Sequence, residues 1–313
     1  MRIVFMGTPE YSATVLTQVH SAGLGDIVGV ITVPDREQGR GRKLNTSPVK
    51  RTSEQLGLRI LQPKSLRPPD VHEDIASLNP DVVIVVAYGL ILPQSLLNIP
   101  IHGCLNLHPS LLPKYRGASP VVSAIRNGDK QTGMSLMLLD AGMDTGPIIK
   151  QKIVETSDTD TAETLTDALF AYGSELLLDS LVPWVNGHIS ASPQDEHHAT
   201  TSKKVDKSDG RADWTLSAQA LDRLRRAFTP WPGLYTSWSE KTLKLLSTVP
   251  IESQDVTDIP GTVVRINELD TPLAIVTSNG LLGIQKLQLE GKTPVSAQEF
   301  LRGYPSVEGA VFQ

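Results

Sequence analysis

The sequence contains a single cysteine, Cys104, which excludes an internal disulfide. It also lacks a long hydrophobic run: the longest extends from Val82 to Leu92, far short of the roughly 18 residues that a membrane-spanning helix needs. Met1 leads directly into an apolar, strand-like stretch, without the basic and hydrophobic regions of a signal peptide. We therefore expect a soluble cytoplasmic protein with no membrane partner.

An excess of basic residues is absent as well. The formal net charge is −5, which argues against a protein that coats nucleic acid through overall positive charge. Any contact with nucleic acid must therefore be local. The 313 residues are 40% hydrophobic and 20% charged, as in ordinary globular proteins, and the chain is long enough for two domains.

Two common kinds of site are also missing from the sequence. The first predicted strand-to-helix turn, at residues 6–10, has one glycine where a dinucleotide-binding fingerprint has three. His197 and His198 lie in a polar stretch without cysteine or further histidine nearby, so we predict no metal site.

The first 155 residues alternate strand-like and helix-like segments. Val82–Val86 is a β-branched run typical of a parallel strand covered on both faces, and Ser47 followed by Pro48 predicts a helix start. The alternation predicts an α/β fold with a doubly wound, mostly parallel sheet, whose site lies at the carboxyl ends of the strands. Strands are predicted at residues 2–6, 26–33, 59–61, 82–86, 101–107, 132–139 and 148–154, and helices at 9–21, 47–57, 70–78 and 161–181.

The rest of the chain has a different pattern. Residues 190–213 are polar and predict a linker. A helix capped by Ser217 follows, and then five short strands with turn signals between them, at 234–238, 242–247, 261–266, 273–277 and 281–289. This spacing predicts a small closed or half-closed, OB-like β-barrel. We predict an α/β domain at 1–189, a linker at 190–213 and a barrel domain at 214–313.

One strand end carries side chains suited to acyl chemistry. Asn106 and His108 are two residues apart before Pro109, so they point to the same face with Cα atoms about 7 Å apart. An amide can donate to a developing oxyanion, and an imidazole can move the proton of an attacking amine. The alternative is a hydrogen-bonded turn at the end of a strand.

A carboxylate and a thiol lie elsewhere in the same part of the sequence. Asp144 follows a predicted strand in a loop with glycines on both sides, and we expect it to face His108, with Asp140 capping the turn. Cys104 shares the strand face with His108 at about 13 Å, too far for an activating hydrogen bond. We predict that Cys104 is a small core residue.

The segment Pro34–Thr46 is polar, glycine-rich and basic. A loop of this length inside a compact domain is commonly functional or mobile. It is either a solvated surface excursion or a basic finger that reaches for phosphate with Arg36, Arg40, Arg42 and Lys43.

Two of these segments together resemble the signature of the 10-formyltetrahydrofolate-dependent formyltransferases. They are Asn106–Gly117, which reads Asn-Leu-His-Pro-Ser-Leu-Leu-Pro-Lys-Tyr-Arg-Gly, and Asp140–Gly146, which reads Asp-Ala-Gly-Met-Asp-Thr-Gly. The likeness covers nearly the whole chain. The features that resemble the members acting on initiator Met-tRNA are at residues 5–10, 34–43, 86–93, 228–233 and 291–298.

The resemblance implies a donor, an acceptor and a set of site residues. It implies 10-formyltetrahydrofolate as formyl donor, no metal, initiator Met-tRNA as acceptor and a monomeric protein. It makes Asn106, His108 and Asp144 the catalytic residues, with a protonated His108 and Asn106 stabilising the oxyanion and Asp144 helping to remove the amine proton. It assigns the folate pocket to Ser110, Leu111, Leu112 and Pro113, with the backbone around Tyr88, Gly89, Leu90 and Ile91 as a further wall. It assigns tRNA contacts to the basic loop with Arg36, Arg40, Arg42 and Lys43, and the basic residues Lys204 and Lys207 of the linker favour the same partner.

Three alternatives remain open at this point. The same catalytic residues would serve a sugar-nucleotide amine formyltransferase, or a formyl-folate hydrolase in which water is the acceptor. A non-catalytic RNA-binding protein that relies on the barrel is an alternative of another class, and the presence of Asn106, His108 and Asp144 argues against it.

Overall fold

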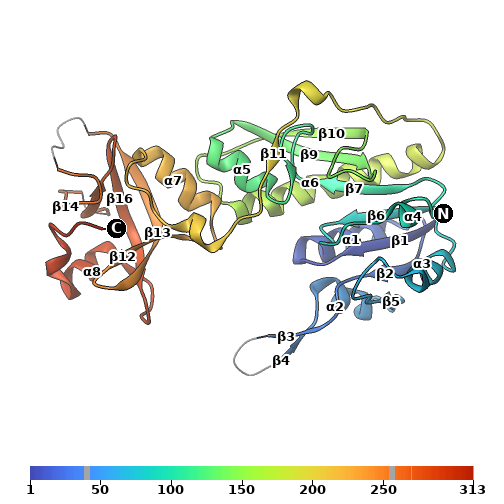
Figure 1. Ribbon diagram of the computed structural model, residues 1–313, viewed down its shortest axis with the longest axis horizontal. Helices are drawn as coiled ribbons and strands as arrows, with labels where there is room; N and C mark the ends of the chain where they lie inside the picture. The colour runs from blue at the N-terminus through green and yellow to red at the C-terminus, as the bar shows by residue number, and fades with distance from the viewer. Residues whose placement is uncertain (39–42, 254–257, 269, 313) are drawn as a thin grey trace. The chain divides into compact units, whose positions relative to one another are not determined.

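The chain forms two compact units (Figure 1). The structure is a computed structural model that describes residues 1–38, 43–253, 258–268 and 270–312, with only the backbone of residues 37, 38, 43 and 44. The first unit comprises residues 1–120, 131–155 and 166–202. The second comprises residues 121–130, 156–165 and 203–313.

The first unit is built on a seven-stranded sheet with the strand order β10-β9-β7-β6-β1-β2-β5. Its strands are β1 (Arg2–Gly7), β2 (Asp26–Ile31), β5 (Ile60–Leu61), β6 (Val82–Val86), β7 (Cys104–His108), β9 (Gln131–Leu138) and β10 (Ile148–Glu155). Its helices are α1 (Glu10–Ala22), α2 (Pro48–Gln55), α3 (Pro69–Ala76), α4 (Gln94–Leu97) and most of α6 (Ala162–Val185). Shorter pieces are β3 (Arg36–Gln38), β4 (Lys43–Asn45), β8 (Arg116–Gly117), η1 (Glu196–His198) and β11 (Thr201–Ser202).

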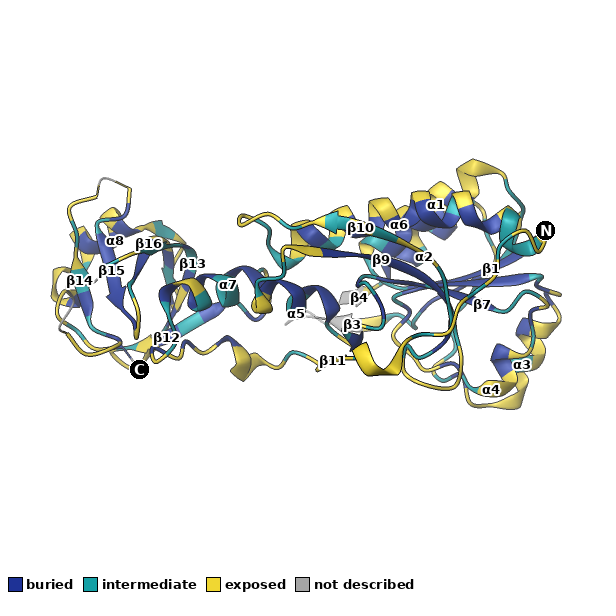
Figure 2. Ribbon diagram, turned by 90° about the horizontal axis from the view of Figure 1, so that it is seen from above, coloured by how far each residue is buried: buried dark blue, intermediate teal, exposed yellow. Residues whose placement is uncertain are grey.

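Helices cover both faces of this sheet (Figure 2). Five neighbouring strands of the sheet are parallel: β5, β2, β1, β6 and β7. β9 and β10 add an antiparallel edge. On one face Val4 and Met6 pack in a cluster with Ile75 of α3, and on the other side of the unit Tyr11 of α1 stacks on Phe170 of α6 with ring centroids 4.2 Å apart. All five residues of β6 are buried. The predicted doubly wound, mostly parallel α/β fold is confirmed.

Two details of the first unit differ from the sequence-based expectation. The segment at 34–46 contains a short antiparallel hairpin, β3–β4, because backbone pairing can form whatever the polarity of the side chains. The strand expected at 101–107 begins at Cys104, since Gly103 has φ +74° and breaks the extended backbone before it.

The second unit is dominated by an antiparallel sheet with the order β12-β13-β16-β15-β14 and β17 paired to β16. Its strands are β12 (Leu234–Trp238), β13 (Lys241–Ile251), β14 (Val263–Arg265), β15 (Leu273–Val276), β16 (Leu281–Leu289) and β17 (Val295–Ser296). Its helices are α7 (Ala218–Ala227), α8 (Ala297–Gly303), η2 (Lys207–Gly210), η3 (Pro305–Val307) and most of α5 (Pro120–Asn127). The predicted small barrel-like domain is confirmed, although α5 and α8 were not expected.

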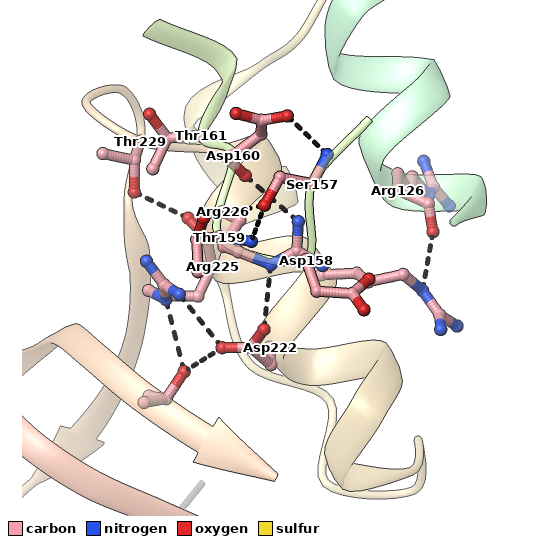
Figure 3. A network of polar contacts seen from close by, with 12 residues as sticks. Arg126, Ser157, Asp158, Thr159, Asp160, Thr161, Asp222, Arg225, Arg226 and Thr229 are labelled. Carbon is pink, nitrogen blue, oxygen red and sulfur yellow. Dashed lines mark hydrogen bonds and ion pairs between the residues drawn. The ribbon is translucent and has the colours of Figure 1, made fainter. Parts of the chain in front are cut away.

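A buried polar network joins three separate segments of the second unit (Figure 3). Asp222 of α7 accepts hydrogen bonds from Arg225, Arg226 and the Thr248 hydroxyl. Arg226 also donates to the backbone carbonyl of Asp160, and Arg223 donates to that of Arg126. A cavity of about 360 Å³ lies beside this network, lined by side chains of both charge signs. These contacts attach the segments 121–130 and 156–165 to α7.

The domain boundaries expected at 189 and 214 remain a prediction, since the two units exchange segments along the chain. In the expected linker, residues 190–202 belong to the first unit and residues from 203 onward to the second. Among the helices of the described residues, none is long and apolar enough to cross a bilayer.

Candidate active site

Asn106 and His108 lie at the carboxyl end of β7, next to β6 on one side and β9 on the other. Leu107 between them is buried in packing, His108 is buried and Asn106 is half-buried. The side chain of Asn106 makes no hydrogen bond to any residue that the structure describes, and its amide is not sealed from solvent. It is therefore free to donate to a ligand at the strand end.

His108 has one ring nitrogen committed to the backbone. Its Nε2 lies 3.1 Å from the carbonyl oxygen of Tyr115, and because a carbonyl only accepts, Nε2 carries a proton. Its Nδ1 lies 3.6 Å from Oδ2 of Asp144. Burial lowers the pKa of His108, against the opposing effects of the Asp144 carboxylate and the Tyr115 carbonyl. The neutral imidazole is therefore the favoured form at neutral pH, in contrast to the protonated His108 that we expected, and Nδ1 is its free base atom.

Asp144 is held by the backbone that follows β7. The amide of Gly117 donates to Oδ2 of Asp144 at 2.8 Å, and Asp144 itself has φ +55°, a left-handed conformation that a non-glycine residue adopts at a cost of about 1–3 kcal/mol. Asp140, in contrast, accepts hydrogen bonds from the amide of Gly142 and the hydroxyl of Thr145 in its own turn. Asp144 faces His108 and Asp140 caps the turn, as expected.

Cys104 takes the structural role that the sequence analysis preferred. Cys104 is 1% exposed, and burial raises the pKa of its thiol to about 12, so it is not a nucleophile. His198 pairs with Asp195 at 2.9 Å. No group of side chains able to hold a metal ion occurs within the described residues.

The residues predicted to form a folate pocket differ in their exposure. Ser110 and Leu112 are buried and bonded inside the unit: the Ser110 hydroxyl donates to the carbonyl of Lys114, and the Leu112 amide donates to Ser135. Leu111 and Pro113, between and after them, are half-buried.

The second predicted wall follows β6. Tyr88 is buried, and its hydroxyl has no hydrogen-bond partner within the described structure. Gly89 has φ +91°, and Leu90 and Ile91 after it are 36% and 83% exposed. Tyr88 packs in the core cluster with Val85 and Leu96, so the exposed part of this predicted wall is Gly89, Leu90 and Ile91.

The residues predicted to contact tRNA lie in both units. Arg36 is an exposed residue of β3, Lys43 is described by its backbone in β4, and Arg40 and Arg42 lie outside the described residues. Lys204 and Lys207 are exposed residues of the second unit.

The sequence analysis missed Gln194, which the structure brings to the site. Its amide nitrogen donates to the backbone carbonyls of Asp144 and Gly146. Arg116 was part of the family signature without an assigned role, and its Nε donates to the Gln194 side chain. No sequence signal marked Gln194, since it lies in a polar stretch with the composition of a linker.

The chain is similar to known proteins over nearly its whole length. The family model described as formyl transferase matches residues 1–181, and that of the formyl transferase C-terminal domain matches residues 204–305. The methionyl-tRNA formyltransferase of Chloroflexus aurantiacus is 43% identical over 97% of both chains. That of Marinobacter nauticus is 42% identical over 97% of this chain and 96% of its own.

A solved structure with the same fold is the N-formyltransferase from Helicobacter canadensis in complex with folinic acid and dTDP-3-aminofucose. The match has a TM-score of 0.65 and 17% identity, over 90% of this chain and 98% of the other. With one family model covering more than half of the sequence and relatives similar over almost all of it, the chain belongs to the formyl transferase family, among the methionyl-tRNA formyltransferases.

Proposed function

We propose that this protein transfers the formyl group of 10-formyltetrahydrofolate to the α-amino group of methionine on initiator Met-tRNA. The observation that carries the proposal is the convergence of Asn106, His108 and Asp144 at the end of β7, in a chain similar to methionyl-tRNA formyltransferases over 97% of its length. The protein acts as a monomer in the cytoplasm.

We assign the binding site of the formyl donor, 10-formyltetrahydrofolate, to the region around the end of β6. The exposed apolar side chains of Leu90 and Ile91 support a site for a flat heterocycle. Leu111 and Pro113, with Ser110 and Leu112 packed behind them, complete the other wall. Gly89 leaves space at its Cα because no other atom lies within 4 Å of an added Cβ.

Asn106 and His108 stabilise the transfer step. The α-amine attacks the formyl carbon, and the Asn106 amide donates to the oxygen that becomes negative. His108 starts neutral and accepts the amine proton at Nδ1, and Asp144 then pairs with the imidazolium, which also stabilises the oxyanion. As the bond from the formyl carbon to N10 breaks, this proton passes to N10, so no further reactant is required.

The acceptor is recognised by basic side chains of both units. Arg36, Arg40, Arg42 and Lys43 in the 34–46 segment, and Lys204 and Lys207 beyond the first unit, are assigned to phosphates of the tRNA. Because the net charge is negative, such contacts act locally rather than through the field of the whole protein.

One assay tests the proposal against its alternatives. The purified protein is supplied with 10-formyltetrahydrofolate and, in separate reactions, initiator Met-tRNA, elongator Met-tRNA, a sugar-nucleotide amine or no acceptor. Formyl-methionine formed on the initiator tRNA alone is the expected result. Preferred formylation of the sugar amine, or release of formate without an acceptor, would assign the site to a sugar formyltransferase or a hydrolase.

A further inference from the structure

The segment of residues 115–117 connects the two ionisable groups of the active site. The carbonyl of Tyr115 accepts the hydrogen bond from Nε2 of His108 at 3.1 Å, and the amide of Gly117 donates to Asp144 at 2.8 Å. Arg116 lies between these two residues in the chain. A displacement of the Arg116 backbone would therefore move the partners of both His108 and Asp144.

The Arg116 side chain is fixed by two residues from the segment 194–202. It is 6% exposed, and its Nε donates to Oε1 of Gln194 at 3.0 Å. Its two terminal nitrogens donate to the two carboxylate oxygens of Glu196 at 3.0 and 2.7 Å. This is the two-pronged geometry by which guanidinium and carboxylate groups hold each other in a fixed orientation.

Gln194 is also hydrogen-bonded to the loop that carries Asp144. Its Nε2 donates to the carbonyl of Asp144 at 2.8 Å and to that of Gly146 at 2.7 Å. Both N–H groups of its amide are thus used on the loop that carries Asp144, while its oxygen accepts from Arg116. The Gln194 amide therefore links the Arg116 side chain to the backbone of the Asp144 loop, beside the direct bond from the Gly117 amide to the Asp144 carboxylate.

The backbone of the 194–202 segment adds further contacts. β11 pairs in parallel with β8, and the Arg116 amide donates to the carbonyl of Thr200 at 2.9 Å. The Tyr115 amide donates to the Thr200 hydroxyl at 2.9 Å, and the Ser202 hydroxyl donates to the carbonyl of Arg116. Tyr115, whose carbonyl holds His108, and Arg116 after it are thus both hydrogen-bonded to the 194–202 segment.

Two residues of this arrangement have left-handed backbone conformations although they are not glycine: Tyr115 has φ +59° and Asp144 has φ +55°. Conformations of this kind persist only where the surrounding contacts determine them. Two side chains of the 194–202 segment bond these residues: the Gln194 amide donates to the carbonyl of Asp144, and the Thr200 hydroxyl accepts from the amide of Tyr115.

We propose that Gln194 and Arg116 are positioning residues for formyl transfer: together they hold the Asp144 carboxylate against the imidazole of His108. The segment 194–202 is thereby a part of the active site and not a spacer. This inference rests on the proposed function, because its effect is read as a change in formyl transfer.

The first test replaces Gln194 by methionine, which has a similar length and loses all three hydrogen bonds of the amide. Gln194→Met is expected to lower kcat for formylation of initiator Met-tRNA about 100-fold, as misplacing a reacting group by about 1 Å does. KM for the donor and for the tRNA should stay within about threefold, because Gln194 touches neither binding region. The matched control is Gln131→Met, since Gln131 donates only to exposed Glu155, and its kcat should be unchanged.

The second test asks whether Gln194 acts through Asp144. In an Asp144→Asn background, Gln194→Met should lower kcat by less than about threefold further, because the carboxylate that it positions is gone. If Gln194 served only to keep the unit folded, the two losses would multiply, and that result would overturn the proposal. Should Gln194→Met fail to fold, Arg116→Lys provides the test, since it keeps the positive charge and loses the two-pronged geometry.

The outcomes separate this inference from the proposed function. A wild-type protein that formylates no Met-tRNA would refute the proposed function. A wild-type protein that is active, together with Gln194→Met and Arg116→Lys variants of unchanged kcat, would refute the positioning role alone.

Discussion

Nδ1 of His108 lies 3.6 Å from Oδ2 of Asp144, while Nε2 of the same ring is bonded to the carbonyl of Tyr115. The ring thus has one nitrogen fixed as a donor and one free to take up a proton beside a carboxylate. Burial disfavours the charged ring until a proton arrives together with developing negative charge. The pair is arranged for a proton that is held transiently, as acyl transfer to an amine requires.

Removing the proposed oxyanion donor tests the role of Asn106. Asn106→Ala should lower kcat about 10²–10³-fold with little change in tRNA affinity, because one hydrogen bond to the oxyanion is lost. Steady-state formylation kinetics and a tRNA-binding titration measure the two quantities. Asn98→Ala is the matched control, since Asn98 is exposed and accepts only from Gln94. A normal kcat for Asn106→Ala would exclude Asn106 from catalysis.

The lowered pKa of His108 predicts how stability depends on pH. Because the folded chain takes up the proton at His108 less readily than the unfolded chain, protonation favours unfolding. The contribution of His108 to the free energy of unfolding is present in full above about pH 6.5 and is lost as the pH falls through the lower pKa of the folded state. Urea unfolding of wild type and His108→Gln over roughly pH 5 to 8, the titration range of histidine, measures this contribution. A difference between the two proteins that does not change over this range would contradict the prediction.

Gly117 is expected to tolerate no side chain. It has φ +108°, and an added Cβ would lie 2.6 Å from the carbonyl oxygen of Ser202. Gly117→Ala should therefore shift the amide that holds Asp144 and lower kcat about tenfold or more. Gly187→Ala is the matched control, because Gly187 also has a positive φ of +69° but has no atom near the position of a Cβ. Equal kcat values for the two variants would show that the clash is relieved elsewhere.

The buried polar network of the second unit predicts a large loss of stability on mutation (Figure 3). Asp222→Ala leaves the guanidinium groups of Arg225 and Arg226 without their carboxylate, and removing one partner of a buried ion pair costs about 3–5 kcal/mol. The midpoint of urea unfolding measures the loss. Asp158→Ala, which breaks an exposed ion pair with Lys130, should leave the midpoint unchanged. A similar midpoint for both variants would contradict the prediction.

A phosphate contact at the 34–46 segment predicts a salt-dependent defect. Arg36→Ala should raise KM for tRNA. It should also reduce the slope of log KM against log salt concentration by about 1, which is the contribution of one phosphate contact. KM for the formyl donor should stay constant. The control substrate is a small methionine amide, for which the variant and the wild type should be alike. An equal defect with that substrate would assign Arg36 a role other than tRNA binding.

The fold and the candidate catalytic residues followed from local patterns along the chain. The β-branched run at Val82–Val86 is buried on both faces of the sheet, as its composition predicts. The period of two along β7 places Asn106 and His108 on one face. Asp144 was preferred over Asp140 on turn chemistry, and the structure has that arrangement. Positions that depend on secondary-structure periodicity were therefore predictable.

Other features depend on residues far apart in the sequence. The Arg116 side chain meets Gln194 across 78 positions, and the amide of Gln194 reaches the carbonyl of Asp144 across 50. A polar stretch has the same composition whether it is a solvated spacer or is bonded to an active site, since the partners that decide between the two are distant in sequence. The sequence alone determined the type of fold, the candidate catalytic residues and the family resemblance. Only the tertiary structure decided that the 194–202 segment holds the Asp144 loop, because long-range hydrogen bonds leave no local periodicity to read.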